Sequence, residues 1–155
     1  MPTIYMMVGV PGSGKSLWIA KQNFDWNTTM VVSSDAIIDQ RAAAQGKTYS
    51  DVFQDEIKAA TLQMNQNLRD AIDNNMNIVW DQTNLTAKSR AGKLSQIPKN
   101  YRKIAVFFPT PDAKELQRRL ASRPGKTIPQ NIVMGMISQL QKPSEAEGFD
   151  EIITT

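Results

Sequence analysis

Short apolar runs alternate with longer amphipathic segments along the whole chain. Each apolar run ends in polar residues or glycine, which is typical of a buried strand. The predicted strands are Thr3–Val8, Met30–Ser33, Asn77–Trp80, Lys103–Phe108 and Glu151–Thr154. Because strands that alternate with helices form parallel sheets, we expect an α/β fold with a parallel sheet of about five strands and helices on both faces.

The segments between these strands carry apolar residues three and four positions apart, the spacing of an amphipathic helix. The predicted helices run from Lys15 to about Asn23, from Ala36, from a cap at Ser50, from a cap at Thr86, from Thr110 and from Pro129. We expect residues 1–155 to form a single domain. In such sheets ligands bind beyond the carboxyl ends of the strands, so the residues that follow each strand are the candidates for function.

The loop after the first predicted strand carries the strongest motif. Residues 9–16 read GVPGSGKS and match the phosphate-binding pattern G-x-x-x-x-G-K-[ST] at every fixed position. Glycines in such a loop let backbone N–H groups turn toward phosphate oxygens. Lys15 is expected to reach the β- and γ-phosphates of ATP, and Ser16 to ligate Mg²⁺. The predicted ATP contacts are Gly9, Pro11, Gly12, Ser13, Gly14, Lys15 and Ser16.

The chain contains neither histidine nor cysteine, which excludes imidazole bases, thiol nucleophiles and thiolate metal sites. A carboxylate is then the natural general base. Asp35 follows the second predicted strand, and a helix N-cap is the alternative interpretation of this residue. Asp81 follows the third predicted strand, where it is expected to lie near the metal, or else to stabilise a turn.

Positive charge is concentrated in the second half of the chain. Residues 86–126 carry a net charge of +9, whereas residues 35–75 carry −3. This asymmetry indicates a polyanionic ligand, or simply solvated helix faces. Within the basic stretch, Arg119 and Arg123 are four residues apart and share a helix face. They are expected to bind the transferring phosphate, unless they only stabilise the end of a helix.

The ordered segments GVPGSGKS, VVSSD, DQTNL and the arginine-rich stretch resemble the kinase domain of bacteriophage-type polynucleotide 5′-hydroxyl kinases. The resemblance implies that Asp35 activates the acceptor hydroxyl, that Asp81 is the carboxylate of the D-x-T-N motif and that Arg123 acts on the transferring phosphate. It also implies ATP and Mg²⁺ as cofactors. The expected acceptor contacts are Asp35, Arg41, Thr83 and Asn84.

One position departs from the pattern of that family. Relatives often carry an arginine three residues after the catalytic aspartate, where it binds the acceptor phosphate, and this chain has Ile38 there, with Arg41 one turn later. Three hypotheses therefore stay open: a kinase for the 5′-hydroxyl of DNA or RNA, a kinase for a nucleoside, small metabolite or modified DNA base, and a nucleotide-binding regulatory module without activity.

Composition is that of a globular protein, and no apolar run approaches the length of a membrane helix. We expect a cytoplasmic protein, in a host cell if it is phage-encoded, that does not bind membranes. The sequence leaves the oligomeric state open, including a homo-oligomer.

Overall fold

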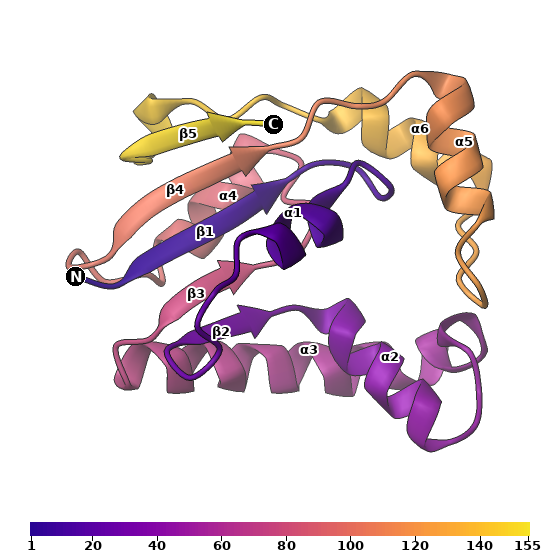
Figure 1. The fold of residues 1–155 in the computed structure, drawn as a ribbon, viewed down its shortest axis with the longest axis horizontal. Coiled ribbons are helices and arrows are strands. Elements are labelled where there is room, and N and C mark those ends of the chain that lie inside the picture. Colours follow the sequence, from indigo (N-terminus) through magenta and orange to yellow (C-terminus); the bar gives the residue numbers. More distant parts are fainter.

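A computed structural model describes residues 1–155, and its centre is one parallel sheet of five strands. The strand order is β2-β3-β1-β4-β5, and every neighbouring pair is parallel. All carboxyl ends therefore meet at the same edge of the sheet (Figure 1). The strands are β1 (Thr3–Val8), β2 (Thr29–Val32), β3 (Asn77–Trp80), β4 (Arg102–Phe107) and β5 (Glu151–Thr154). The predicted fold class is confirmed, and every predicted strand is present to within one residue at either end.

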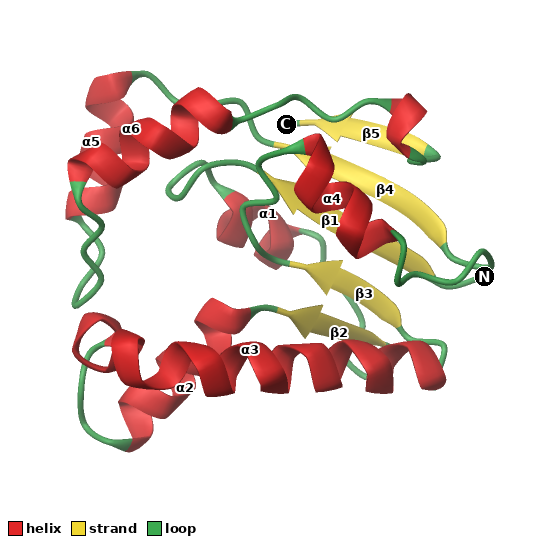
Figure 2. Cartoon of the chain, turned by 180° about the vertical axis from the view of Figure 1, so that it is seen from behind, coloured by secondary structure: helices red, strands yellow, loops and turns green.

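Helices cover both faces of the sheet, as predicted. Figure 2 shows α3 and α4 on one face, with α1 on the other and α5 and α6 beyond the carboxyl ends of the strands. No helix combines the length and the apolar character that crossing a membrane requires. The helices are α1 (Lys15–Lys21), α2 (Ser34–Ala44), α3 (Tyr49–Asp73), α4 (Ala87–Leu94), α5 (Ala113–Ala121), α6 (Gln130–Gln139) and a short 3-10 helix at Glu145–Glu147.

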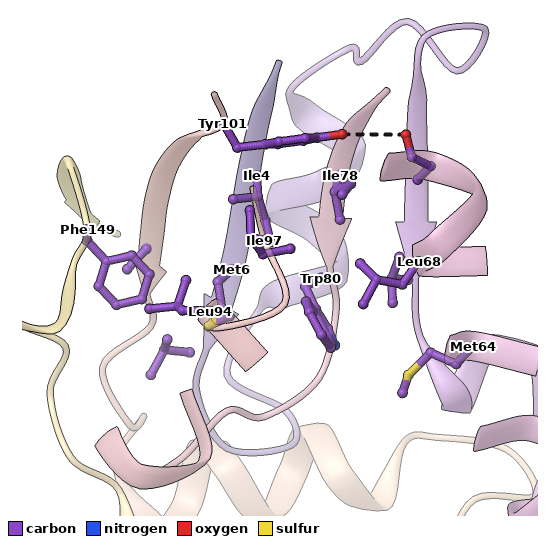
Figure 3. Close-up of a cluster of buried hydrophobic side chains, with 14 residues drawn as sticks. Ile4, Met6, Met64, Leu68, Ile78, Trp80, Leu94, Ile97, Tyr101 and Phe149 are labelled. Atoms are coloured by element: carbon purple, nitrogen blue, oxygen red, sulfur yellow. Dashed lines mark hydrogen bonds between the residues drawn. The ribbon is translucent and has the colours of Figure 1, made fainter. Parts of the chain in front are cut away.

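The main hydrophobic core lies between the sheet and the helices α3 and α4 (Figure 3). Successive side chains of a strand point to opposite faces, so Ile4 and Met6 enter this core while Met7 packs on the α1 side. Both faces are buried, which explains why the strands read as continuous apolar runs. Trp80 and Tyr101 are the largest side chains of the main core, and the Tyr101 hydroxyl donates to the Met76 carbonyl oxygen at 2.7 Å.

The capping residues of α3 and α5 differ from the predicted ones. Thr48, not Ser50, caps α3, because Thr48 and Asp51 exchange side chain–backbone hydrogen bonds in a capping box. The helix predicted from Thr110 begins only after Asp112, whose carboxylate accepts from a backbone N–H one turn later. In both cases another polar residue within two positions makes the capping bond, and the sequence pattern alone does not choose between them.

Candidate active site

The loop Gly9–Ser16 joins β1 to α1 at the carboxyl edge of the sheet, where the motif predicts it. Gly12 and Gly14 have φ of +81° and +106°, a region that side chains disfavour. Gly9 is needed for a different reason. A Cβ atom there would lie 2.9 Å from the Cβ of Phe108 and 2.6 Å from the Ser13 hydroxyl. The glycines of the motif are therefore required by backbone conformation and by close packing.

The interior of this loop offers unpartnered donors that fit a phosphate group. The backbone N–H groups of Gly12, Gly14, Lys15 and Ser16 make no hydrogen bond within the chain. The buried Ser13 hydroxyl also has no partner. Buried donors are rarely left unpaired in proteins, so their convergence on one cavity indicates a site for an anion with several oxygens.

Lys15 extends into the same cavity. Its ammonium donates to the carbonyl oxygens of Gly9 and Val10 at 2.9 and 2.8 Å. Burial is the main cause that lowers the pKa of Lys15 to about 8; Arg123 acts in the same direction, and Asp81 and Asp35 oppose the shift. Phosphate oxygens of a bound nucleotide would favour the charged form of this amine.

Ser16 and Asp81 are the residues that fit a nucleotide-bound Mg²⁺. Ser16 is exposed to the cavity, and Asp81 lines the same cavity, where burial raises the pKa of its carboxyl and the nearby Lys15 opposes the shift. No group of three or more Asp or Glu side chains is arranged to hold a metal alone. The donor set therefore fits an ion whose other ligands are phosphate oxygens and water, as in P-loop enzymes.

Asp35 lies in the first turn of α2 and faces the cavity. The N-cap of α2 is Ser33, whose hydroxyl accepts from the backbone N–H of Ala36 at 3.2 Å. The alternative interpretation of Asp35 as a cap is therefore wrong. One carboxylate oxygen, Oδ1, accepts a 2.7 Å hydrogen bond from the Tyr49 hydroxyl, and the other, Oδ2, has no partner in the chain. This oxygen can accept the proton of a hydroxyl group.

Another wall of the cavity is formed by Arg119, Arg123 and Lys126. They belong to the segment of α5, α6 and their connecting loop (residues 113–139), which we call the lid. Leu116 and Leu120 pack so closely on Gly12 that a Cβ there would meet them at 3.1 Å. Arg119 donates to the Gly12 carbonyl oxygen at 3.0 Å and to Glu115 at 2.8 Å, and so attaches the lid to the phosphate-binding loop.

Arg123 differs from every other arginine of the chain. The remaining six donate to carboxylate, carbonyl or amide oxygens, whereas the Arg123 guanidinium makes no hydrogen bond or ion pair. It lines the same cavity as Lys15, and its charge acts on that amine. A planar, unpaired guanidinium in such a place can bind charge that develops on a phosphoryl group.

One cavity of about 840 Å³ brings these groups together. Most of the residues predicted from the sequence line it: Pro11, Gly12, Ser13, Gly14, Lys15, Ser16, Asp35, Asp81, Thr83, Arg119 and Arg123. Gly9 packs closely against Phe108 and Ser13 and does not line the cavity. Asp39 and Lys126 do, although sequence reasoning did not select them. Their signal was weak, since each is one more charged residue on an exposed helix or loop.

Two predicted acceptor contacts lie elsewhere. Arg41 does not line the cavity and pairs with Glu56 at 2.9 Å. Asn84 is only 2% exposed, and its amide donates to the Met7 carbonyl oxygen at 2.7 Å. The structure thus corrects both placements: Arg41 has a carboxylate partner on α3, and Asn84 holds the loop after β3 against the sheet.

Comparison with known proteins places the chain in a family. A model described as an AAA domain matches residues 4–143, which is most of the chain. The chain belongs to this family. Its kinase-type P-loop fold, a parallel sheet of five strands flanked by helices, matches that of solved P-loop kinases.

The similar solved structures include the Pnkp1/Rnl/Hen1 RNA repair complex, with a TM-score of 0.68, 22% identity, and coverage of 96% of this chain and 46% of that one. A fungal RNA kinase matches with a TM-score of 0.56, 15% identity, and coverage of 99% and 74%. A gluconokinase from Sinorhizobium meliloti matches with a TM-score of 0.53 and 18% identity, and the match covers 99% of this chain and 81% of that one.

Among curated proteins, the heterogeneous nuclear ribonucleoprotein U-like protein 2 of Mus musculus is 24% identical over 157 residues. This match covers 96% of the chain but 21% of the mouse protein. The chain therefore spans less than half the length of both this relative and the RNA repair protein it matches.

In this P-loop kinase fold, two cations of the basic stretch belong to the interior. Arg90 is fully buried, makes a two-point ion pair with Glu147 at 2.7 and 3.1 Å, and donates to the Asn84 carbonyl oxygen at 2.8 Å. Lys93 donates to Gln82 at 2.9 Å and to the Asn84 side chain, and burial lowers its pKa to about 8. Both residues fix the Asp81–Asn84 loop instead of meeting a ligand.

We expect Arg90→Met to lower the free energy of unfolding by about 3–5 kcal/mol, because it leaves the Glu147 carboxylate without its partner. Arg102→Met is the matched control. Arg102 also pairs with a glutamate, at 2.8 Å, but both side chains of that pair are nearly half exposed, and such pairs contribute about 0–1 kcal/mol. Urea unfolding of the two variants checks this, and equal losses would mean that Arg90 has no special structural role.

Proposed function

We propose that residues 1–155 act as one ATP-dependent kinase domain that transfers the γ-phosphate of ATP to a hydroxyl group, with the 5′-hydroxyl of DNA or RNA as the acceptor. One observation carries the proposal. Asp35 and the unpaired Arg123 enter, from opposite walls, the same cavity that holds the phosphate-binding loop. A nucleotide-binding module without activity needs neither group there.

The proposed chemistry uses each group once. Lys15 and the backbone N–H groups of the loop would hold the β- and γ-phosphates, and a Mg²⁺ ion at Ser16 would neutralise part of their charge. The acceptor oxygen forms a bond to the γ-phosphorus as the bond from that phosphorus to the bridging oxygen of ADP breaks. The hydroxyl proton passes to the free oxygen of Asp35. Arg123 binds charge on the phosphoryl oxygens during transfer.

Two observations support a polynucleotide acceptor. The similar solved structures include an RNA repair complex and a fungal RNA kinase. In addition, Lys126 of the lid extends into the cavity near Asp35, and its amine lies 3.4 Å from the Asp39 carboxylate. This cation is available to an acceptor phosphate because its ion pair with Asp39 is long and the Asp39 side chain is half exposed, so the pair itself is weak.

A second candidate acceptor is a small hydroxyl compound without a phosphate at that position, such as a nucleoside or metabolite. Ile38 favours it. This residue occupies the position of the acceptor-binding arginine of related kinases, yet it is fully buried with Ala42, Val52 and Ala60. Arg41 is paired with Glu56 and does not replace it.

Incubation with γ-labelled ATP and a panel of acceptors tests the proposal. The panel contains DNA and RNA oligonucleotides with 5′-hydroxyl ends, the same oligonucleotides with 5′-phosphate ends, nucleosides, and water alone. We expect label only on the 5′-hydroxyl ends, and none with Lys15→Ala, which controls for contaminating kinases. Label on nucleosides alone would favour the second candidate, and release of inorganic phosphate alone would contradict acceptor phosphorylation.

A further inference from the structure

Tyr49 contacts the candidate base directly, although it belongs to another helix. It is the first residue of α3, and its hydroxyl donates to Asp35 Oδ1 at 2.7 Å. Burial, together with this hydrogen bond, raises the pKa of the Tyr49 phenol. The hydroxyl therefore stays protonated and remains a donor throughout the physiological pH range. No other group of the chain donates to the Asp35 side chain.

The Tyr49 ring is itself held from two sides. On one side it packs on Phe53, with ring centroids 5.5 Å apart, at the margin of the cluster that contains Ile38. On the other side the Lys126 ammonium lies over the ring, 4.3 Å from its centroid. A side chain fixed in this way can orient a carboxylate without losing further rotamer freedom.

The contact with Lys126 is part of a wider junction between the lid and the start of α3. The Ser50 N–H donates to the Gly125 carbonyl oxygen at 3.0 Å, and the Thr127 N–H donates to the Ser50 hydroxyl at 3.1 Å. Gly125 approaches Thr48 so closely that a Cβ would lie 2.6 Å from that side chain. Figure 1 shows the loop between α5 and α6 reaching the α2–α3 connection across the open edge of the sheet.

Tyr49 thus touches the base through its hydroxyl and the lid through its ring. We propose that Tyr49 is a positioning residue for the kinase reaction: with the lid against α3, its hydroxyl fixes one oxygen of Asp35 and leaves the other aimed into the cavity for the acceptor proton. The inference rests on the proposed function, since it takes Asp35 as the base. It assigns to Tyr49 an effect on turnover and not on nucleotide binding.

Tyr49→Phe tests this role, because it removes only the hydroxyl and keeps both the ring packing and the contact with Lys126. We expect kcat to fall about tenfold, with KM for ATP unchanged. In an Asp35→Asn background the same change should cost nothing further, since the two residues act as a unit. Tyr101→Phe is the matched control. It removes a hydroxyl that bonds to a core carbonyl oxygen, and should lower Tm without changing kcat.

The outcomes separate the inference from the function on which it rests. Wild-type kcat in Tyr49→Phe, alongside a strong loss in Asp35→Asn, would overturn the positioning role and leave the kinase assignment intact. The positioning role would also be overturned if Tyr49→Phe lowered kcat by the same factor in the Asp35→Asn background as in the wild-type protein. Wild-type kcat in Asp35→Asn would instead show that Asp35 is not the base, and would contradict the proposed mechanism.

Discussion

Arg123→Ala is expected to lower kcat by about 10³-fold, within the range of about 10³–10⁵ known for arginines that stabilise phosphoryl transfer. The physical reason is that Arg123 has no partner in the chain, so its charge is fully available to the transferring phosphate. KM for ATP should change little, because Lys15 and the loop N–H groups hold the nucleotide. Single-turnover kinetics with saturating ATP measure the effect on the chemical step.

Two further variants define what Arg123 does. Arg123→Lys should restore only part of the activity, since an ammonium lacks the planar pair of donors. Arg118→Ala should keep normal kcat. Arg118 lies on α5, pairs with Glu115 at 2.6 Å and does not line the cavity. A loss of about tenfold or less in Arg123→Ala would make Arg123 a helix-end cation that stabilises α5 and nothing more.

Much of this architecture can be predicted from the sequence, because it depends on the spacing of apolar residues and on the polar residues or glycines that end each apolar run. The apolar runs place all five strands, and the GVPGSGKS motif places the phosphate-binding loop at the edge where the sheet ends. Asp35 and Asp81 were predicted for the same reason: Asp81 directly follows β3 and Asp35 comes three residues after the end of β2, and parallel strands bring such residues to one edge.

The parts that escaped prediction depend on contacts between distant segments. Tyr49 reads as an aromatic residue near a helix start, and only the packing of α3 against α2 brings it to Asp35. Arg90 reads as a member of a basic stretch, yet tertiary packing buries it against Glu147, far along the chain. Arg41 was predicted to contact the acceptor, but it forms an ion pair with Glu56 on the neighbouring helix. Charge pattern alone does not distinguish these cations.

Asp39 provides the control for the candidate base. It lies on α2 one turn after Asp35, lines the same cavity and is half exposed. Asp39→Asn removes the same charge by the same isosteric change, and leaves the Tyr49–Asp35 hydrogen bond in place. A small effect of Asp39→Asn on kcat, beside a large one of Asp35→Asn, would attribute the loss to proton transfer and not to the electrostatic field of the cavity.

Asp35→Asn itself is expected to lower kcat by about 10²–10⁴-fold, the contribution of a positioned general base. The amide cannot take a proton, but its oxygen can still accept from the Tyr49 hydroxyl, so the geometry of the site should persist. The helix should persist as well, because Ser33 and not Asp35 makes the capping bond of α2. ATP affinity, measured by calorimetry, should stay within a few-fold of the wild-type value. Reduced thermal stability with retained turnover would contradict the assignment, since it would give Asp35 a structural role and leave the acceptor proton without a base.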